Sequence, residues 1–162
     1  MHEMLGHLHF MSKDYDTALV HYEKVVRGGN ASTEIRKRAI ICYVRARRIT
    51  EAISLFERLI VDDIECVVKH NQDSYGCPCP EIIDEYERSL NANAVTQDDR
   101  IALGILWLFC SLPRSLEIFA EALHRDPGRP FLKSVMKLLT TRSATTPAIF
   151  HQSLDRERHY EQ

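Results

Sequence analysis

Residues 17–25 read TALVHYEKV, and residues 51–59 read EAISLFERL. In each stretch a small residue is followed four positions later by an aromatic residue, and three positions after that by an aliphatic one. The two stretches are 34 residues apart, and His9 and Tyr43 keep the same separation. A period near 34 with this pattern indicates stacked helical hairpins, because one hairpin cannot bury its apolar face alone.

Three further motifs fit the same kind of hairpin. Leu5-Gly6 and Leu103-Gly104 place a glycine in a first helix, where the missing Cβ lets the second helix approach closely. Asp126-Pro127 ends the last hairpin. The chain resembles the tetratricopeptide repeat family over about residues 2–128. The second unit departs from the family pattern, since Ala39-Ile40 stands where the Leu-Gly pair is expected.

We therefore expect an all-α fold, a tetratricopeptide-like α-α superhelix with a C-terminal capping helix. Ser32, Thr50 and Thr96 are the expected N-caps of three of its helices. The third unit is the irregular one, since its first half matches the repeat poorly. The expected organisation is one domain over 1–140, with units at 2–30, 31–63, 64–95 and 96–128, a capping helix at 130–140, and a linker and polar C-terminal segment at 141–162.

Charge is unevenly spread along the chain, whose formal net charge is −2. Residues 62–99, called the acidic segment below, carry two Lys or Arg and ten Asp or Glu. The parts before and after it each have a net charge of +3. The weak overall charge does not indicate a general nucleic-acid-binding surface. The acidic segment is either a solvated face or a site for a basic partner.

The sequence favours a reducing, cytoplasmic setting. The five cysteines are an odd number without the spacing of a disulfide framework. No signal peptide is expected, because the first residues lack a basic start followed by a long apolar stretch. The longest apolar run, 105–110, is far too short to span a bilayer.

The family resemblance implies that the first helices of the hairpins line a concave groove in which peptides lie. A cluster of arginines and Lys37 in the second unit could hold carboxylates, which predicts an acidic or carboxylate-ended peptide partner. The alternative is that these side chains pair with neighbouring acids or with the acidic segment. The residues of this predicted groove are His7, Phe10, Met11, Lys37, Ile41, Arg45 and Arg48.

A second set of residues has the chemistry of a metal site. Cys66, His70, Cys77 and Cys79 offer thiolate and imidazole ligands of the kind that zinc prefers. They lack the paired two-residue spacings typical of zinc sites, so incidental cysteines remain an alternative. A reactive thiol at a helix start is a further alternative. The eight scattered histidines are interpreted as solvated or packed side chains.

The predicted function is a non-catalytic scaffold or adaptor that binds a protein or peptide partner, without a cofactor. No phosphate-binding loop, nucleophile elbow or recognisable carboxylate pair indicates an enzyme. Two alternatives stay open: a metal-binding or redox-responsive protein using the Cys66–Cys79 region, and an RNA-binding helical repeat. The apolar residues of the fourth unit are expected to pack under a terminal helix or against a second copy of the chain: Ile101, Ile105, Leu108 and Phe109.

Overall fold

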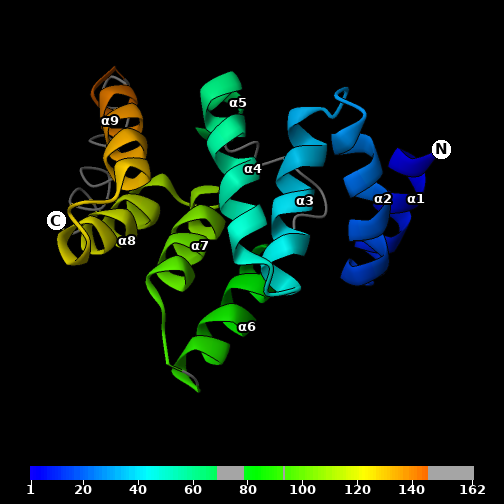
Figure 1. Cartoon of the computed structure of the whole chain (residues 1–162), viewed down its shortest axis with the longest axis horizontal. Coiled ribbons are helices and arrows are strands. Elements are labelled where there is room, and N and C mark those ends of the chain that lie inside the picture. The colour runs from blue at the N-terminus through cyan, green and yellow to red at the C-terminus, as the bar shows by residue number, and fades with distance from the viewer. Residues whose placement is uncertain (69–78, 93, 146–162) are drawn as a thin grey trace, which may run out of the picture.

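The computed structural model of the protein describes residues 1–68, 79–92 and 94–145, and these residues form nine α-helices without a strand. The helices follow one another as stacked, mostly antiparallel elements (Figure 1). The predicted all-α fold is thereby confirmed. The helices are α1 His2–Met11, α2 Tyr15–Arg27, α3 Thr33–Arg45, α4 Ile49–Asp62, α5 Ile64–Val68, α6 Cys79–Asn91, α7 Gln97–Leu108, α8 Leu112–Arg125 and α9 Pro130–Thr145.

Glycine sets the close approach of the helices in two hairpins, α1–α2 and α7–α8. A Cβ built on Gly6 would lie 2.7 Å from Cε1 of Tyr22, and one on Gly104 would lie 2.7 Å from Cε1 of Phe119. Both rings are fully buried. In both hairpins, therefore, the aromatic ring of the second helix fills the space that the glycine leaves open.

Turn and cap residues define where the helices begin and end. Lys13 and Arg47 occupy the turns of the first two hairpins with positive φ values of 62° and 60°. Ser32 caps α3, and Thr96 forms a capping box with Asp99 at the start of α7, as expected. Thr50 is not a cap, because α4 already begins at Ile49 and has no side-chain cap.

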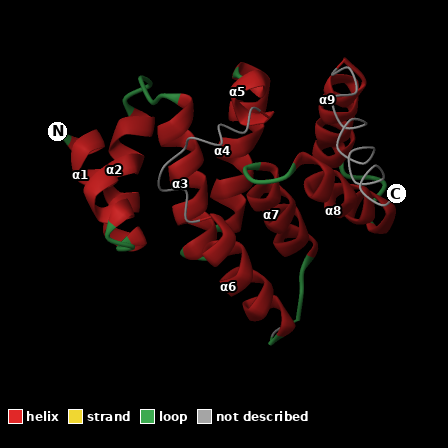
Figure 2. Ribbon diagram, turned by 180° about the vertical axis from the view of Figure 1, so that it is seen from behind, coloured by secondary structure: helices red, strands yellow, loops and turns green. Residues whose placement is uncertain are grey.

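The irregular part of the chain lies between α4 and α7. The short helix α5 packs on α4, whereas α6 packs on α7. Helix α7 also packs directly on α4, so the second and fourth hairpins touch each other (Figures 1 and 2). In the described part of the chain, no complete hairpin separates them. The division into four units stays a prediction.

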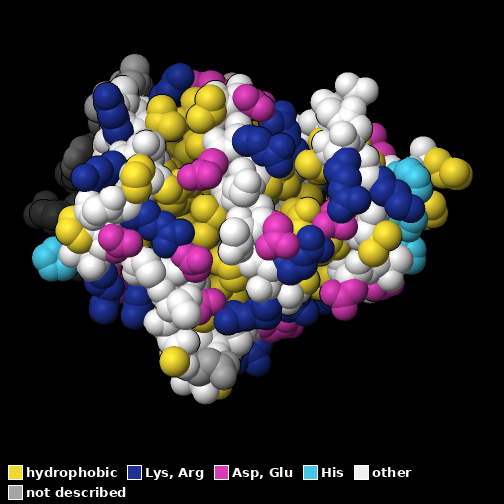
Figure 3. All heavy atoms as spheres, in the orientation of Figure 1, with side chains coloured by type: hydrophobic (Ala, Val, Ile, Leu, Met, Phe, Trp, Pro, Cys, Tyr) yellow, Lys and Arg dark blue, Asp and Glu magenta, His cyan; other side chains and the backbone are white. Residues whose placement is uncertain are grey.

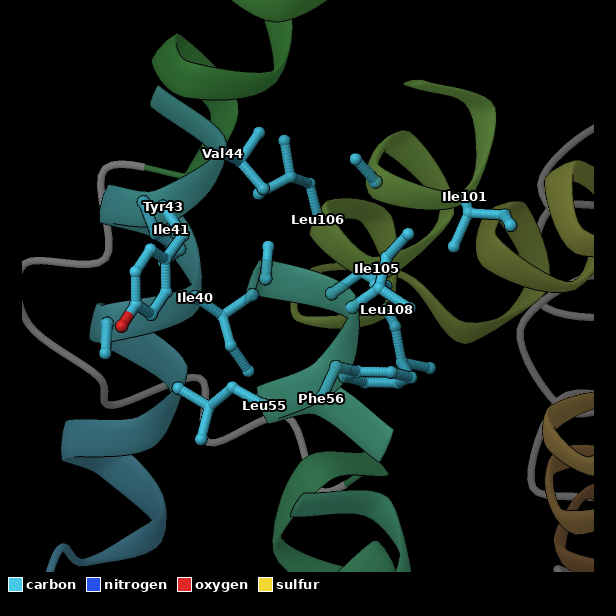
Figure 4. Packing of buried hydrophobic residues seen from close by; sticks show 14 of the residues in the cluster. Ile40, Ile41, Tyr43, Val44, Leu55, Phe56, Ile101, Ile105, Leu106 and Leu108 are labelled. Carbon is cyan, nitrogen blue, oxygen red and sulfur yellow. The ribbon is translucent and has the colours of Figure 1, made fainter. Parts of the chain in front are cut away.

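One continuous hydrophobic core runs through the array. Ile40 and Phe56 from the second hairpin and Leu108 from the fourth all have no exposed surface, and they lie in one cluster (Figure 4). The Phe131 ring of α9 contacts both Phe56 and Phe119 edge to face. Aromatic packing thus ties α9 to the second and fourth hairpins together.

Helix α9 packs on α8 as the predicted C-terminal capping helix, and it is longer than the expected 130–140. Its inner residues Leu132, Val135 and Leu139 are buried, whereas Lys133 and Lys137 point outward and are exposed. A helix that is apolar inside and polar outside closes the array at this end. Within the described ranges, no helix is long and apolar enough to cross a membrane.

Candidate functional site

The predicted groove residues do not all reach the surface. His7, Met11 and Arg45 are exposed, and Lys37 and Arg48 are partly exposed. Phe10 and Ile41 are each only 3% exposed and belong to the core, which corrects their assignment to a peptide-binding surface. Phe10 packs its ring edge to face against Tyr15 and Tyr22, so it contributes to the packing inside the first hairpin.

The two arginines at the centre of the acidic-peptide hypothesis already have carboxylate partners. Arg45 forms an ion pair with Glu85 of α6, and its guanidinium lies 4.9 Å from the centre of the Tyr15 ring. Arg48 reaches Oε1 of Glu23 and Oε1 of Glu51, each at 2.9 Å. An incoming acidic peptide would have to compete with these internal carboxylates.

The neighbouring basic side chains are engaged in the same way. Nζ of Lys37 donates a hydrogen bond of 2.8 Å to the backbone oxygen of Cys66. His7 contacts Arg38, which also pairs with Glu34 at 3.2 Å. Arg36 pairs with Asp62 at 2.7 Å, and Arg47 pairs with Asp99 at 3.0 Å. The basic cluster is therefore largely neutralised by the chain itself.

Half of these carboxylate partners, Asp62, Glu85 and Asp99, belong to the acidic segment, residues 62–99. Its carboxylates pair with basic residues from both of the parts that carry a net positive charge, before and after the segment. On the surface, basic and acidic side chains accordingly alternate, without one large patch of a single sign in this view (Figure 3). The pairs are Lys13–Glu81, Arg36–Asp62, Arg45–Glu85, Arg47–Asp99, Arg129–Asp98 and Arg142–Glu65.

The best-buried polar group of this network is Asp99. Its Oδ1 accepts hydrogen bonds from the Tyr86 hydroxyl at 3.0 Å and pairs with Arg47 at 3.0 Å. Its Oδ2 accepts from the backbone N–H and the hydroxyl of Thr96. Burial raises the pKa of Asp99, but the hydrogen bonds from Thr96 and Tyr86 and the charge of Arg47 outweigh it, so the pKa is lowered. Asp99 is thus a structural carboxylate. Through Tyr86 it joins α7 to α6, and through Arg47 it joins α7 to the turn before α4.

The predicted metal set can be placed only in part. Cys66 is exposed on α5, and Cys79 is the first residue of α6, whereas His70 and Cys77 lie outside the described residues. Among the described residues, no three His, Cys, Asp or Glu side chains gather so that they could hold a metal ion. Burial raises the pKa of the Cys42 thiol to about 12 and that of Cys110 to about 11, which disfavours their reactive thiolates.

The apolar residues of the fourth unit are buried within the chain. Ile101, Ile105 and Leu108 have no exposed surface, and Phe109 contacts the Phe56 ring edge to face. The structure packs this face on α4 of the second hairpin, whereas the sequence predicted packing under a terminal helix or against a second copy. Among the described residues, this buried face of α7 therefore offers no surface to a groove shared with α1 and α3.

A cleft that the sequence did not predict lies along the outer side of α7, between α6 and α8. This α7 cleft has a volume of about 330 Å³. Trp107 contacts two of its lining residues: Nε1 donates a hydrogen bond of 3.1 Å to Oε1 of Glu87, and Arg114 lies over its ring. The spacing of Arg100, Leu103 and Trp107 on one helix face is the signal that could have indicated it. The lining residues are Glu87, Leu90, Asn91, Val95, Arg100, Leu103, Arg114, Ile118 and Glu121.

The side chains of three histidines also contact one another, whereas the sequence was interpreted as having scattered, unconnected histidines. Nδ1 of His2 and Nδ1 of His21 are 3.1 Å apart, and the His9 ring stacks on the His21 ring with centroids 5.6 Å apart. His9 in turn contacts Asp14 at 3.0 Å. The seven-residue spacing of His2 and His9 on α1 indicates one shared helix face, but only the hairpin brings His21 between them.

Comparison with known proteins adds little to this description. No protein-family model and no curated protein matches the chain. Among solved structures, a chain described as "MamA MSR-1 C2" is 17% identical, with 88% of this chain and 85% of that chain covered and a TM-score of 0.37. A similarity at this level carries no argument about fold or function.

Proposed function

We propose that the protein is a cytoplasmic, non-catalytic scaffold that binds a peptide or helix of a protein partner. The observation that supports this proposal best is the α7 cleft. It is an open, partly apolar channel between two helices, and its rim carries charges of both signs. Such a site suits an amphipathic segment, which can bury apolar side chains and keep its polar face at the rim.

The side chains of the cleft define the chemistry of that segment. Leu103 of α7 and Ile118 of α8 are partly exposed apolar contacts on two neighbouring helices. Arg100 has no ion-pair partner among the described residues, whereas Arg114 pairs with Glu117 at 2.7 Å. We therefore infer a short amphipathic helix whose apolar side contacts Leu103 and Ile118 and which places a carboxylate near Arg100.

The predicted groove around Arg45 and Arg48 is the second candidate surface, for an acidic peptide. Binding there requires exchange of the internal carboxylates Glu85, Glu23 and Glu51 for those of the partner. Because exposed ion pairs contribute only about 0–1 kcal/mol each, such an exchange is energetically feasible but brings little net gain. The α7 cleft needs no such exchange at Arg100, and we rank it first.

Affinity capture with matched variants tests the proposal. The purified chain captures a partner from lysate, and the dissociation constant of that purified partner is then measured for each folded variant. We expect Leu103→Gln/Ile118→Gln to weaken binding about tenfold or more, since apolar contacts in the cleft are lost. The double variant Val20→Gln/Val61→Gln, which changes two exposed apolar residues elsewhere, should bind like the wild type.

The other outcomes discriminate between the alternatives. Loss of binding in Arg45→Glu/Arg48→Glu, with the cleft variant unaffected, would move the site to the predicted groove. Unchanged affinity in both variants would contradict both surfaces. Stoichiometric zinc in protein prepared without a metal-affinity tag would favour the metal-binding alternative in the Cys66–Cys79 region. Salt-sensitive binding of single-stranded RNA would favour the RNA-binding alternative.

A further inference from the structure

Helix α6 forms one wall of the α7 cleft, but it has no hairpin partner among the described residues. In the pairs α1–α2, α3–α4 and α7–α8, two helices that are adjacent in sequence pack on each other. Helix α6 instead packs mainly on α7, whereas the preceding helix α5 packs on α4. Glu87, Leu90 and Asn91 of α6 line the cleft. The shape of the cleft therefore depends on what holds α6 against α7.

Two hydrogen bonds attach α6 to the two ends of α7. The Tyr86 hydroxyl donates to Oδ1 of Asp99 at 3.0 Å, in the first turn of α7. Nε1 of Trp107, in the last turn of α7, donates to Oε1 of Glu87 at 3.1 Å. Asp99 and Trp107 are eight positions apart, which is about 12 Å along a helix. Because Tyr86 and Glu87 are consecutive residues, the contact of Tyr86 with Asp99 constrains where Glu87 can lie.

Arg47 supports the first of these bonds from the turn between α3 and α4. Its Nη2 atom lies 3.0 Å from Oδ1 of Asp99, the same oxygen that accepts from Tyr86. Its guanidinium also lies 5.6 Å from the centre of the Tyr86 ring. Arg47 is not among the residues that line the α7 cleft. We therefore expect Arg47 to act on the cleft through Asp99 and Tyr86.

The two carboxylate oxygens of Asp99 have separate roles. Oδ1 accepts from Tyr86 and pairs with Arg47, whereas Oδ2 accepts from the backbone N–H and the hydroxyl of Thr96 in the capping box of α7. Burial and the negative charge of Asp99 raise the pKa of Tyr86, so its hydroxyl stays protonated and remains a donor. The Oδ1 contacts can thus be removed while the helix cap is kept, and the cap can be removed while the Oδ1 contacts are kept.

We propose that Arg47, Asp99 and Tyr86 are positioning residues for the α7 cleft. They hold α6 so that Glu87 contacts Trp107, and they thereby set the shape of the cleft and its affinity for a partner segment. Side chains that line a site bind well only when the contacts behind them fix their positions. The inference rests on the proposed function where it concerns affinity, whereas the position of α6 can be measured without any partner.

Trp107 is the only tryptophan of the chain, so its fluorescence reports directly on the contact with Glu87. Tyr86→Phe keeps the ring and removes the hydroxyl, and Arg47→Gln removes the positive charge beside Oδ1. In both folded variants we expect the emission of Trp107 to shift to longer wavelength and its quenching by acrylamide to increase, because α6 shields the indole less well. Glu87→Ala removes the contact itself and gives the size of the full effect. A wild-type spectrum for Glu87→Ala would contradict the contact on which the proposal depends.

Thr96→Val is the matched control, because it removes the hydroxyl of the cap and leaves Oδ1 of Asp99 with Tyr86 and Arg47. It should lower the stability of the protein but leave the emission and quenching of Trp107 unchanged. Equal spectral changes in Thr96→Val and Tyr86→Phe would show a general structural role and overturn the proposal. A wild-type spectrum for either Tyr86→Phe or Arg47→Gln would also overturn it.

Affinity for the captured partner separates this inference from the proposed function. Tyr86→Phe should raise the dissociation constant about threefold or more, which is of the order of one lost hydrogen bond. Shifted fluorescence of Tyr86→Phe, together with normal binding by Leu103→Gln/Ile118→Gln, would leave the positioning of α6 intact and contradict the proposed function. Weakened binding by Leu103→Gln/Ile118→Gln, with Tyr86→Phe unchanged in fluorescence and affinity, would support the proposed function and overturn the positioning.

Discussion

At the scale of single residues, Gly6 and Gly104 determine how closely the two helices of their hairpins approach each other. Their Cα atoms face the rings of Tyr22 and Phe119, which have no exposed surface. In the second hairpin Ile40 occupies the corresponding position and is itself fully buried. The same period in sequence therefore accommodates two different kinds of packing, a ring on a glycine and an aliphatic side chain beside a ring.

We expect Gly104→Ala to destabilise the protein. The added Cβ would meet Phe119 at 2.7 Å, and overpacking of this kind costs about 1–3 kcal/mol, more than the gain of up to about 1 kcal/mol from helix propensity. Chemical denaturation of both forms measures the difference. Gly28→Ala is the control, because its nearest atom lies at 3.4 Å and its φ is −70°. Equal free energies of unfolding for Gly104→Ala and wild type would contradict the close contact.

Asp99 and Asp98 are adjacent residues in very different surroundings. Asp99→Ala should cost about 2–4 kcal/mol, since it removes a buried acceptor from Tyr86, Thr96 and Arg47. Asp98→Ala breaks a pair with Arg129 that is partly exposed and should cost less than about 1 kcal/mol. Urea denaturation of the two variants makes the comparison, and equal losses would argue against the buried network.

At the scale of elements, we expect the contact of α1 with α2 to depend on pH. His21 of α2 faces His2 and His9 of α1, with Lys24 on its own helix and Asp14 beside His9. The pKa of His21 is lowered below the ordinary value of 6.5. Desolvation is the largest cause, and charge repulsion from His2, His9 and Lys24 adds to it. The folded protein therefore binds a proton at His21 less readily than the unfolded chain does.

Stability should consequently fall as the pH is lowered through about 6.5. A lowered histidine pKa favours the folded state at higher pH, and this contribution is lost once the unfolded chain takes up the proton. Melting temperatures of the wild type between pH 5 and pH 8 should show this decline, and His21→Asn should reduce it. An identical pH profile for the two proteins would show that His21 is not the group responsible.

The contact of α6 with the first two hairpins is an element-scale feature with a functional consequence. Glu81 pairs with Lys13 in the first turn, and Glu85 pairs with Arg45 at the end of α3. An acidic helix of the chain itself thus takes the place at which an acidic partner was expected. Sequence composition alone cannot distinguish an internal from an external partner, because both have the same chemistry.

At the scale of the whole molecule, α9 joins parts that are distant in sequence. Phe131 contacts Phe56 of the second hairpin and Phe119 of the fourth, so removal of its ring should weaken the packing of both hairpins. We expect Phe131→Ala to cost about 3–5 kcal/mol, as for other buried aromatic residues. Lys133→Ala, on the exposed side of the same helix, should change stability by no more than about 0.5 kcal/mol.

Thermal unfolding followed by circular dichroism compares the two variants. Because Phe131 belongs to a core shared by several helices, its loss should lower the midpoint of the whole transition instead of producing a separate early step. An early loss of the α9 signal alone, with the main midpoint unchanged, would show that α9 is an independent appendage.

The sequence by itself determined the all-α fold, the hairpin contacts at Gly6 and Gly104, and the caps at Ser32 and Thr96. These features depend on residues within one helix or one hairpin, where the helical period decides which side chains meet. It did not determine that Phe10 and Ile41 belong to the core, or that the arginines are paired internally.

Only the tertiary structure decided those points, together with the α7 cleft and the exposure of Met4 and Leu8 on α1. Helix α7 packs on α4 as well as on α6, which buries the face carrying Ile105 and leaves the face carrying Leu103 at the cleft. The apolar pattern of α7 fits either arrangement, because a helix with apolar residues on several sides can be buried on any of them. Which side is covered depends on where the neighbouring helices lie, and that is set by packing between residues far apart in the chain.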